Sequence, residues 1–269
     1  MNKKIKIKNI VIVPARIGSK RIKQKNIKKF FGKPIIYWTL RSLKNFKIFD
    51  KIYISTDSEK IINIVKKFGF KDFILRNKTL SNDYASTQSV IIDALKKISL
   101  KNNYDNIFCV YPCNPFLQKK DLKKAINIIS KNKESFILPI VKYSHPIEKA
   151  FYYKDSKFIS RYIKNSRTTR TQDYKEKFHD TGTFYLAKKK IWEQKQQNKM
   201  IGIKTSWLNG IDIDTDAVTD ANNRFQSDKC RFETCDIFNL KNTFDKEQFE
   251  VCVSIETFEH LPPERIDEY

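Results

Sequence analysis

Short apolar runs alternate with segments of helical periodicity over the first half of the chain, and this alternation constrains the fold most strongly. We predict strands at residues 10–13, 51–55, 106–111 and 136–141, and helices near residues 34–45, 59–68, 86–98 and 120–130. Strands and helices in this order form right-handed βαβ units, in which helices cover both faces of a parallel sheet. The sequence therefore predicts an α/β fold with a mainly parallel sheet.

The composition is that of a globular protein. A chain of 269 residues with 40% hydrophobic side chains can bury a full core. Because no apolar run is long enough to span a bilayer and Met1-Asn-Lys-Lys is not followed by the apolar segment of a signal peptide, we expect a cytoplasmic protein without a membrane partner. The five cysteines form no Cys-x-x-Cys pair, which argues against a zinc ribbon or a disulfide framework.

The net charge of +23 raises nucleic-acid binding as a function, because clustered cations dominate such binding. Here the lysines are dispersed along most of the chain among Ile, Asn and Phe, so we expect no nucleic-acid partner. The composition changes near residue 207, since residues 207–269 hold 15 acidic and only six basic side chains. The change predicts a C-terminal tail whose composition differs from that of the rest of the chain.

The first predicted strand runs directly into a Gly/Ser loop that is rich in cations. Gly18 and Ser19 supply backbone amides that can approach an anion closely, and positive charge comes from Arg16, Lys20, Arg21 and Lys25. The spacing matches neither the P-loop nor the Gly-x-Gly-x-x-Gly motif. We interpret the loop as a polyphosphate site, with a basic surface loop as the alternative.

Three polar or charged residues lie at or just past the ends of predicted strands, and they are Arg16, Asp57 and Tyr111. In a parallel sheet the ligand lies outside the carboxyl ends of the strands. We therefore expect the three side chains to lie on one rim of the sheet.

Several further blocks follow the loop. They are Phe31-Gly-Lys-Pro34, Ile54-Ser-Thr-Asp57, Leu75-Arg76, Leu80-Ser-Asn-Asp-Tyr-Ala-Ser-Thr87, Tyr111-Pro-x-x-Pro-Phe116, Pro146-Ile-Glu-Lys-Ala150, Arg167-Thr-Thr-Arg-Thr-Gln-Asp173, Phe178-His-Asp-Thr-Gly-Thr-Phe-Tyr185 and Asp212-Ile-Asp-Thr215. In this order they resemble the cytidylyltransferases that activate nonulosonic acids, such as sialic and pseudaminic acid, as CMP-sugars. The blocks between residues 146 and 185 resemble the pseudaminic acid branch most.

The resemblance implies a Rossmann-like nucleotidyltransferase domain over residues 1–215. Residues 143–180 would form a small projecting element that pairs two subunits in a homodimer and contributes to the neighbour's sugar site. The implied reaction transfers CMP from CTP to a nonulosonic acid and releases pyrophosphate, for surface glycan synthesis or flagellin glycosylation. Pseudaminic acid is the expected acceptor, and N-acylneuraminate or legionaminic acid is the alternative.

The resemblance also assigns residues to the nucleotide. Arg16, Lys25 and Asp214 would be catalytic, and CTP would contact Ala15, Arg16, Gly18, Ser19, Lys20, Lys25, Asn26, Arg76, Ala85 and Thr87. Considered by themselves, several of these have plainer roles: Lys20 and Lys25 can be solvated, and Ser86 or Thr87 can cap the following helix. Asp57 and Ser58 can cap the helix after the second predicted strand in the same way.

The acceptor sugar is an acid, so its site needs cations or hydrogen-bond donors. The resemblance assigns to it Tyr111, Arg167, Arg170, Gln172 and His179. Tyr111 stands where sialic acid enzymes often carry Gln, which predicts a different pocket. His179 could equally be a packed side chain beside Phe178.

A divalent cation is the implied cofactor. Asp212 and Asp214 are spaced so that both lie on one face of an extended segment, which suits Mg²⁺ with phosphate oxygens. An acidic turn at a strand end is the alternative. The sequence names no general base.

The resemblance fails after Thr215. Residues 249–263 look instead like the fourth-strand region of class I S-adenosylmethionine-dependent methyltransferases, so residues 216–269 are expected to be a methyltransferase-like fragment or an irregular tail. A working methyltransferase would need a Gly-rich loop upstream, and residues 188–207 contain only Gly202. Because the two resemblances meet near Thr215, the sequence leaves open whether Asp212 and Asp214 derive from the cytidylyltransferase-like part or from the methyltransferase-like part.

Overall fold

The computed structural model describes residues 8–19, 22–30, 32–98, 104–154, 158–161, 170–194 and 199–206. The chain divides into two units, Met1–Ile213 and Asp214–Tyr269, and every described residue belongs to the first. The predicted tail at residues 216–269 lies outside the described residues, and so do Lys20, Arg21, Arg167, Asp212 and Asp214. The predictions made for them stay predictions.

Most helices and strands alternate along the chain. The strands are β1 (Asn9–Pro14), β2 (Lys29–Phe30), β3 (Lys33–Pro34), β4 (Lys51–Thr56), β5 (Phe73–Leu75), β6 (Asn106–Val110), β7 (Phe136–Lys142), β8 (Phe151–Lys154), β9 (Phe158–Arg161), β10 (Phe178–Asp180), β11 (Phe184–Ala187) and β12 (Met200–Lys204). The α-helices are α1 (Ile35–Phe46), α2 (Glu59–Lys66), α3 (Thr87–Lys97), α4 (Lys119–Lys131) and α5 (Lys189–Trp192). Four short 3₁₀ helices are η1 (Lys25–Ile27), η2 (Lys78–Leu80), η3 (Ile147–Lys149) and η4 (Thr171–Asp173).

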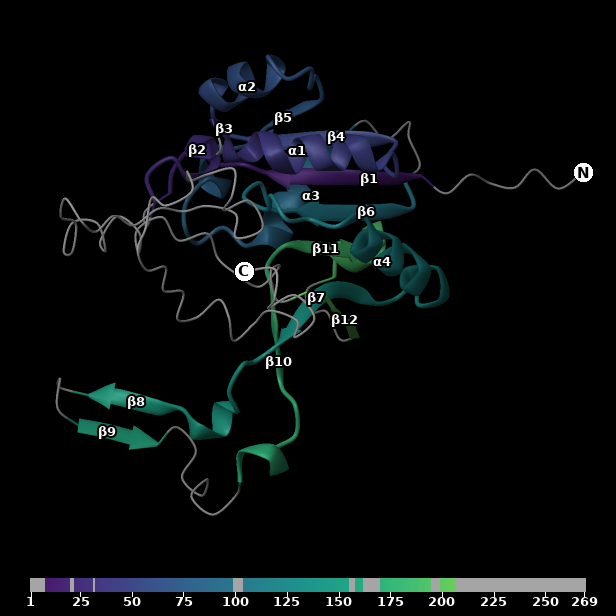
Figure 1. Ribbon diagram of the computed structural model, residues 1–269. Helices are drawn as coiled ribbons and strands as arrows, with labels where there is room; N and C mark the ends of the chain where they lie inside the picture. Colours follow the sequence, from purple (N-terminus) through teal and green to yellow (C-terminus); the bar gives the residue numbers. More distant parts are fainter. Residues whose placement is uncertain are drawn as a thin grey trace, which may run out of the picture. The chain divides into compact units, whose positions relative to one another are not determined.

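The main sheet has β1 near its centre (Figure 1). The strand order is β10-β7-β11-β6-β1-β4-β5, and β12 pairs with β7. The pairs β1–β4, β1–β6, β4–β5 and β7–β12 are parallel, whereas β11 runs antiparallel to β6 and β7, and β10 runs antiparallel to β7. The predicted mainly parallel α/β sheet is confirmed, with an antiparallel insertion between β6 and β7.

The apolar side chains of β1 point alternately to two separate cores. Val11 and Val13 pack with buried residues of α1, α2 and α4 on one face of the sheet. Ile10 and Ile12 pack with buried residues of α3 and α5 on the other face. All four side chains are fully buried, which explains why β1 shows no polar alternation in the sequence.

The predicted elements agree closely with the structure. The four predicted strands correspond to β1, β4, β6 and β7, and the four predicted helices to α1, α2, α3 and α4. Among the described residues, β8 and β9 form a separate two-stranded antiparallel sheet. No helix among the described residues is long and apolar enough to cross a bilayer.

Candidate nucleotide and sugar site

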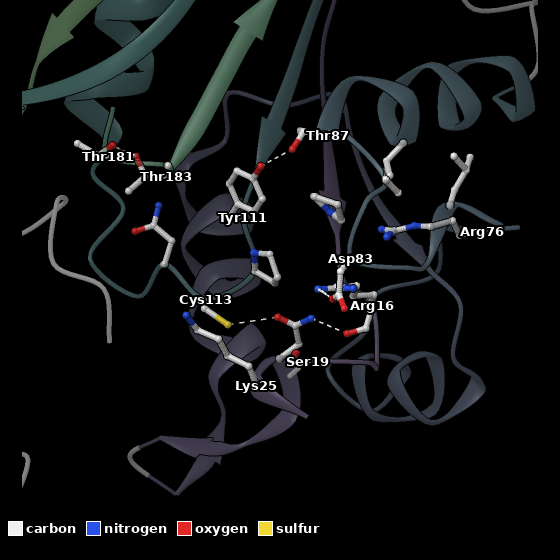
Figure 2. Close-up of a pocket in the computed structure, with 18 of the residues that line it drawn as sticks. Arg16, Ser19, Lys25, Arg76, Asp83, Thr87, Tyr111, Cys113, Thr181 and Thr183 are labelled. Carbon is white, nitrogen blue, oxygen red and sulfur yellow. Dashed lines mark hydrogen bonds and ion pairs between the residues drawn. The ribbon is translucent and has the colours of Figure 1, made fainter. Parts of the chain in front are cut away.

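A cavity of about 570 Å³ lies where the carboxyl ends of β1, β4, β5 and β6 meet (Figure 2). The three rim residues predicted from strand ends are close to it: Arg16 and Tyr111 line the cavity, and Asp57 holds the loop that carries Arg16. Further lining residues come from the loop between β5 and α3, the segment after β6 and the turn between β10 and β11. The main polar lining residues are Arg16, Ser19, Lys25, Asn26, Arg76, Asn82, Asp83, Thr87, Tyr111, Asn114, Asp180, Thr181 and Thr183.

The loop after β1 is held in place by two side chains. Asp57 Oδ1 accepts a hydrogen bond from the Ile17 backbone N–H at 3.0 Å. Asn26 is buried. Its Nδ2 donates a hydrogen bond to the Arg16 carbonyl at 2.7 Å, and its Oδ1 accepts a hydrogen bond from the Cys113 thiol, with 3.2 Å between Sγ and Oδ1. Asn26 therefore fixes the conformation of the loop and also lines the cavity.

Arg16 forms an ion pair with Asp83 across the cavity. The Arg16 Nη2 and Asp83 Oδ1 atoms are 2.6 Å apart, and each side chain keeps about 30% of its surface exposed. Figure 2 shows the two side chains meeting at one end of the cavity, near Ser19 and Lys25. Sequence reasoning missed Asp83, because its place beside Arg16 depends on a contact between two distant loops.

Arg76 is buried at the end of β5. Its Nη2 donates to the Ser55 carbonyl at 2.9 Å, and its Nε donates to Ser55 Oγ at 3.3 Å. Burial lowers the pKa of the Arg76 guanidinium, and the nearby Asp57 carboxylate partly opposes that shift. A desolvated guanidinium fixed to β4 offers its remaining N–H groups in a defined direction.

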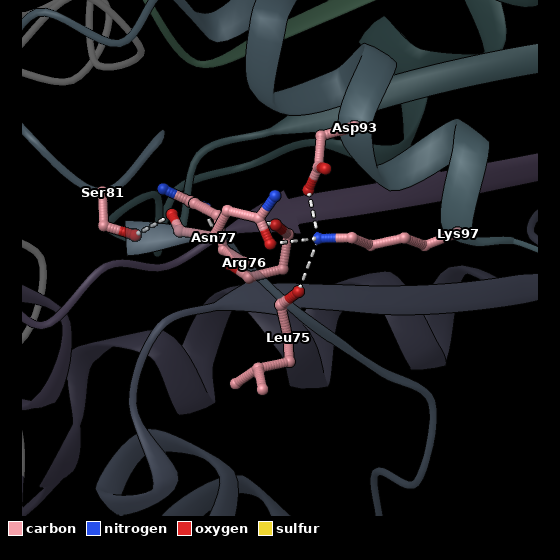
Figure 3. A network of polar contacts seen from close by, with 7 residues as sticks. Leu75, Arg76, Asn77, Ser81, Asp93 and Lys97 are labelled. Atoms are coloured by element: carbon pink, nitrogen blue, oxygen red, sulfur yellow. Dashed lines mark hydrogen bonds and ion pairs between the residues drawn. The ribbon is translucent and has the colours of Figure 1, made fainter. Parts of the chain in front are cut away.

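The loop after Arg76 is tied to α3 by Lys97, as Figure 3 shows. Lys97 Nζ donates to the Leu75 carbonyl at 2.9 Å, to Asn77 Oδ1 at 3.2 Å and to Asp93 Oδ2 at 2.8 Å. Ser81 Oγ donates to the Asn77 carbonyl at 3.1 Å. These contacts position the segment that brings Asn82, Asp83 and Ala85 to the cavity.

The hydroxyl groups of Thr87 and Tyr111 are hydrogen-bonded to each other. Ser86, and not Thr87, caps α3, because Ser86 Oγ accepts from the Ser89 N–H at 3.1 Å. Thr87 is thereby left for Tyr111. Burial raises the pKa of Tyr111 to about 12, so this hydroxyl stays protonated at neutral pH.

At the start of α2, after β4, the serine again caps the helix and its neighbour contacts another part of the site. Ser58 Oγ accepts from the Ile61 N–H and caps α2, whereas Asp57 turns to the loop after β1. Asp57 thus acts on the site through loop geometry, and it does not cap the helix.

The other end of the cavity is built from the segment after β6 and the turn before β11. Thr39 on α1 is fully buried, donates to the Pro112 carbonyl at 2.8 Å and accepts from the Asn114 N–H at 3.0 Å. Asp180 accepts from the Gly182 N–H at 2.8 Å through Oδ1 and from the Tyr185 hydroxyl through Oδ2. Sequence reasoning missed Asn114 and Asp180, although both lie within blocks that it had singled out.

The structure brings most of the predicted nucleotide residues together. The predicted nucleotide residues that line the cavity are Arg16, Ser19, Lys25, Asn26, Arg76, Ala85 and Thr87. Ala15 is buried behind them, and Gly18 is exposed beside the cavity without lining it.

Of the predicted sugar residues, Tyr111 lines the cavity, and the other described ones lie outside its lining. Arg170 and Gln172 are exposed at η4, and neither belongs to the cavity lining. The His179 ring packs against Tyr143, with ring centroids 4.8 Å apart, and the side chain does not line the cavity. Their roles in acceptor binding stay predictions.

The expected metal ligands fall outside the described residues. Among the residues that the structure describes, no three His, Cys, Asp or Glu side chains come together as a metal site. The Mg²⁺ site expected at Asp212 and Asp214 therefore stays a prediction.

Comparisons with known proteins show the family of the chain. A family model described as cytidylyltransferase matches residues 10–248. The chain is 37% identical over 187 residues to a pseudaminic acid cytidylyltransferase of Campylobacter jejuni. The aligned region covers 69% of this chain and 81% of that protein. It is 28% identical over 212 residues to N-acylneuraminate cytidylyltransferase A of Danio rerio, covering 76% of this chain and 47% of that protein.

Among solved structures, a CMP:2-keto-3-deoxy-manno-octonic acid synthetase in complex with CTP has a similar fold. The TM-score is 0.54 at 13% sequence identity, with 74% of this chain and 90% of that chain covered. At this identity the likeness supports the fold alone.

Proposed function

The chain belongs to the cytidylyltransferase family, and from this premise we propose that it transfers CMP from CTP to pseudaminic acid and releases pyrophosphate. The acceptor would attack the α-phosphorus through its anomeric hydroxyl. Relatives named for pseudaminic acid and for N-acylneuraminate support a nonulosonic acid as the acceptor class. The greater identity to the former favours pseudaminic acid.

One observation carries the proposal: the cationic loop after β1 and the buried Arg76 after β5 line the same cavity, from strands on either side of β4. Arg16, Lys25 and Arg76 supply positive charge there, and Ser19 supplies a hydroxyl. Positive charge helps to bind the triphosphate of CTP, and it also stabilises the pyrophosphate that leaves when CMP is transferred. The cavity is large enough for a nucleotide and part of a sugar.

The residues divide the chemistry between them. We assign Arg16 and Lys25 to the phosphates, where they would neutralise charge on the leaving pyrophosphate. Thr87 and Ala85 lie nearer the pyrimidine, and Tyr111 lies between the nucleotide and the acceptor. Mg²⁺ held by Asp212 and Asp214 would supply further charge neutralisation on the phosphates.

A homodimer formed through the β8–β9 hairpin is part of the same proposal. Two aromatic side chains at its base, Phe151 and Tyr152, are about half exposed, as expected of a surface that a second subunit covers. Light scattering should give twice the mass of the chain, and a monomer that turns over normally would contradict the dimer.

Pyrophosphate release tests the reaction. The full chain should release pyrophosphate only when CTP, Mg²⁺ and a sugar acid are all present, and pseudaminic acid should give a higher kcat/KM than N-acylneuraminate or legionaminic acid. Preference for another acid would correct the acceptor while leaving the reaction class intact. Binding of S-adenosylmethionine without CTP turnover would instead support a methyltransferase.

Arg16→Ala tests the phosphate assignment. The variant should keep its fold and lose turnover, whereas Arg41→Ala, which removes the same charge from the exposed face of α1, should stay active. Full activity of Arg16→Ala would remove Arg16 from the site.

Asp214→Asn tests the metal assignment. In calorimetry the variant should need far more Mg²⁺ to bind CTP tightly, and its activity should fall with that affinity. An unchanged Mg²⁺ dependence would place the metal elsewhere.

A further inference from the structure

The two ends of the cavity differ in charge. The cationic lining side chains, Arg16, Lys25 and Arg76, come from the loop after β1 and the end of β5. The segment after β6 and the turn before β11 contribute one carboxylate, Asp180, and otherwise neutral groups. Figure 2 shows Tyr111 between Arg76 and the pair Thr181 and Thr183.

The neutral end is formed by two neighbouring chain segments. Strands β6 and β11 are antiparallel partners, with Val110 opposite Phe184. The segment leaving β6 and the turn entering β11 therefore lie at the same edge of the sheet. The Tyr111 N–H donates to the Thr183 carbonyl at 3.0 Å and joins them directly.

Asn114 contributes an unused hydrogen-bond donor to this end. The residue is only 5% exposed, and its Nδ2 has no hydrogen-bond partner among the described residues. Its backbone N–H is fixed by the buried Thr39, so the amide group is held on a rigid segment. A buried donor without a partner is costly, and a bound group with an acceptor oxygen would remove that cost.

Asp180 contributes the complementary acceptor. Its two oxygens each accept one hydrogen bond from the protein, from the Gly182 N–H and from the Tyr185 hydroxyl. A carboxylate has about four lone-pair positions, so two stay available for a ligand. The two protein donors hold the carboxylate in a fixed orientation at the cavity.

The lining side chains contributed by the segment after β6 and the turn before β11 include one carboxylate, Asp180, and no cation, so an uncharged polar group suits them better than an anionic one. An acylamino group is uncharged and suits them. Its carbonyl oxygen needs a donor, its N–H needs an acceptor, and its methyl group needs apolar contact. Asn114, Asp180 and the pair Pro115 and Phe116 offer these three features in the same lining.

We propose that Asn114 and Asp180 form a subsite that recognises an acylamino substituent of the acceptor sugar and directs its carboxylate away from this end. Asn114 donates to the acyl carbonyl, and Asp180 accepts from the amide N–H. The subsite rests on the proposed function and adds to it the substituent that selects the acceptor. Both residues touch the substrate without taking part in bond breaking.

The test compares two sugar acids on the full chain, with CTP and Mg²⁺ present. One is pseudaminic acid, which carries acylamino groups, and the other is 2-keto-3-deoxy-manno-octonic acid, which carries none. Apparent affinity is measured as KM, or as an inhibition constant for an acid that is not turned over. Wild type should bind the acylated acid more tightly.

Asn114→Asp and Asp180→Asn should each lower the affinity for the acylated acid about tenfold, as expected for loss of one or two hydrogen bonds. The affinity for the other acid should stay unchanged. The KM for CTP should stay the same. Asn114→Ser serves as a second variant at the first position, and thermal denaturation checks that each variant folds.

Asn82→Asp is the matched control. It adds the same negative charge to the lining at the nucleotide end and keeps the oxygen that accepts from the Tyr84 and Ala85 N–H groups. This variant should weaken CTP binding and leave the ratio between the two sugar acids unchanged.

Two results would overturn the subsite. Unchanged discrimination in the Asn114 and Asp180 variants would show that neither residue contacts the acylamino group, and equal weakening of both acids would show a purely structural role. If wild type forms no CMP-sugar from any nonulosonic acid, the proposed function itself fails and the subsite falls with it. Active wild type with unchanged selectivity overturns the subsite alone.

Discussion

Asp83→Asn should tighten CTP binding, because Asp83 holds Arg16 in an ion pair that a triphosphate must compete with. The two charged groups are 2.6 Å apart in the cavity. Removing the carboxylate charge frees the guanidinium and also removes repulsion between Asp83 and the phosphates. Both effects act in the same direction.

The exposure of the pair sets the magnitude. At an effective dielectric constant of about 20, two charges roughly 4 Å apart attract by about 4 kcal/mol, which is an upper bound here. Both side chains keep about 30% of their surface exposed, and ion pairs open to solvent contribute at most about 1 kcal/mol. We therefore expect CTP to bind about fivefold more tightly to Asp83→Asn.

Calorimetry with CTP in the absence of a sugar acid measures this change. Asp93→Asn is the matched control, because Asp93 pairs with Lys97 on α3 and its loss changes the net charge equally. In an Arg16→Ala background the gain from Asp83→Asn should shrink, since the competing pair no longer exists. High salt should reduce the gain as well.

Weaker CTP binding by Asp83→Asn would refute this reasoning. It would mean that Asp83 contacts the bound nucleotide or its metal ion. An equal gain in Asp93→Asn would trace the effect to net charge, and an undiminished gain without Arg16 would separate Asp83 from the ion pair.

Three further predictions concern the frame of the site. Gly18→Ala should leave the free energy of unfolding nearly unchanged, because an added Cβ meets no atom within 4 Å. If a phosphate of CTP approaches this backbone, the variant should bind CTP more weakly. An unchanged affinity for CTP would exclude that approach. Thr39→Val should lower the free energy of unfolding in urea by about 2 kcal/mol, because the Pro112 carbonyl and the Asn114 N–H both lose a buried partner; a change below about 0.5 kcal/mol would contradict this. The pKa of Tyr111 is raised from 10.0 to about 12, so the unfolded chain ionises first and the free energy of unfolding should fall as pH rises from 10 to 12. Tyr111→Phe should lessen that fall by roughly 2 kcal/mol, and an identical pH profile would show that Tyr111 is not responsible.

The site brings together several of the blocks that the sequence analysis singled out. Each block supplies one wall of the same cavity: the loop after β1, the loop before α3, the segment after β6 and the turn before β11. The segments between the blocks form helices and sheet that need only the right hydrophobic pattern.

The sequence by itself determined the main layers of the fold. Residues 10–13 predict a buried central strand because all four are apolar, and Val11 and Ile12 indeed face opposite cores. Hydrophobic periodicity is a local property, so strands and helices with a strong pattern can be recognised from neighbouring residues alone. The cationic loop after β1 was recognisable for the same reason.

The tertiary structure alone decided which distant residues meet. Strand β11 enters between β6 and β7 through hydrogen bonds to both, and nothing in residues 184–187 specifies these partners locally. The same holds for the pairing of Arg16 with Asp83 and for the shared lining of Asn114 and Asp180. Such contacts arise from packing the whole sheet, because burying its two faces fixes where each strand ends and which side chains those ends bring together.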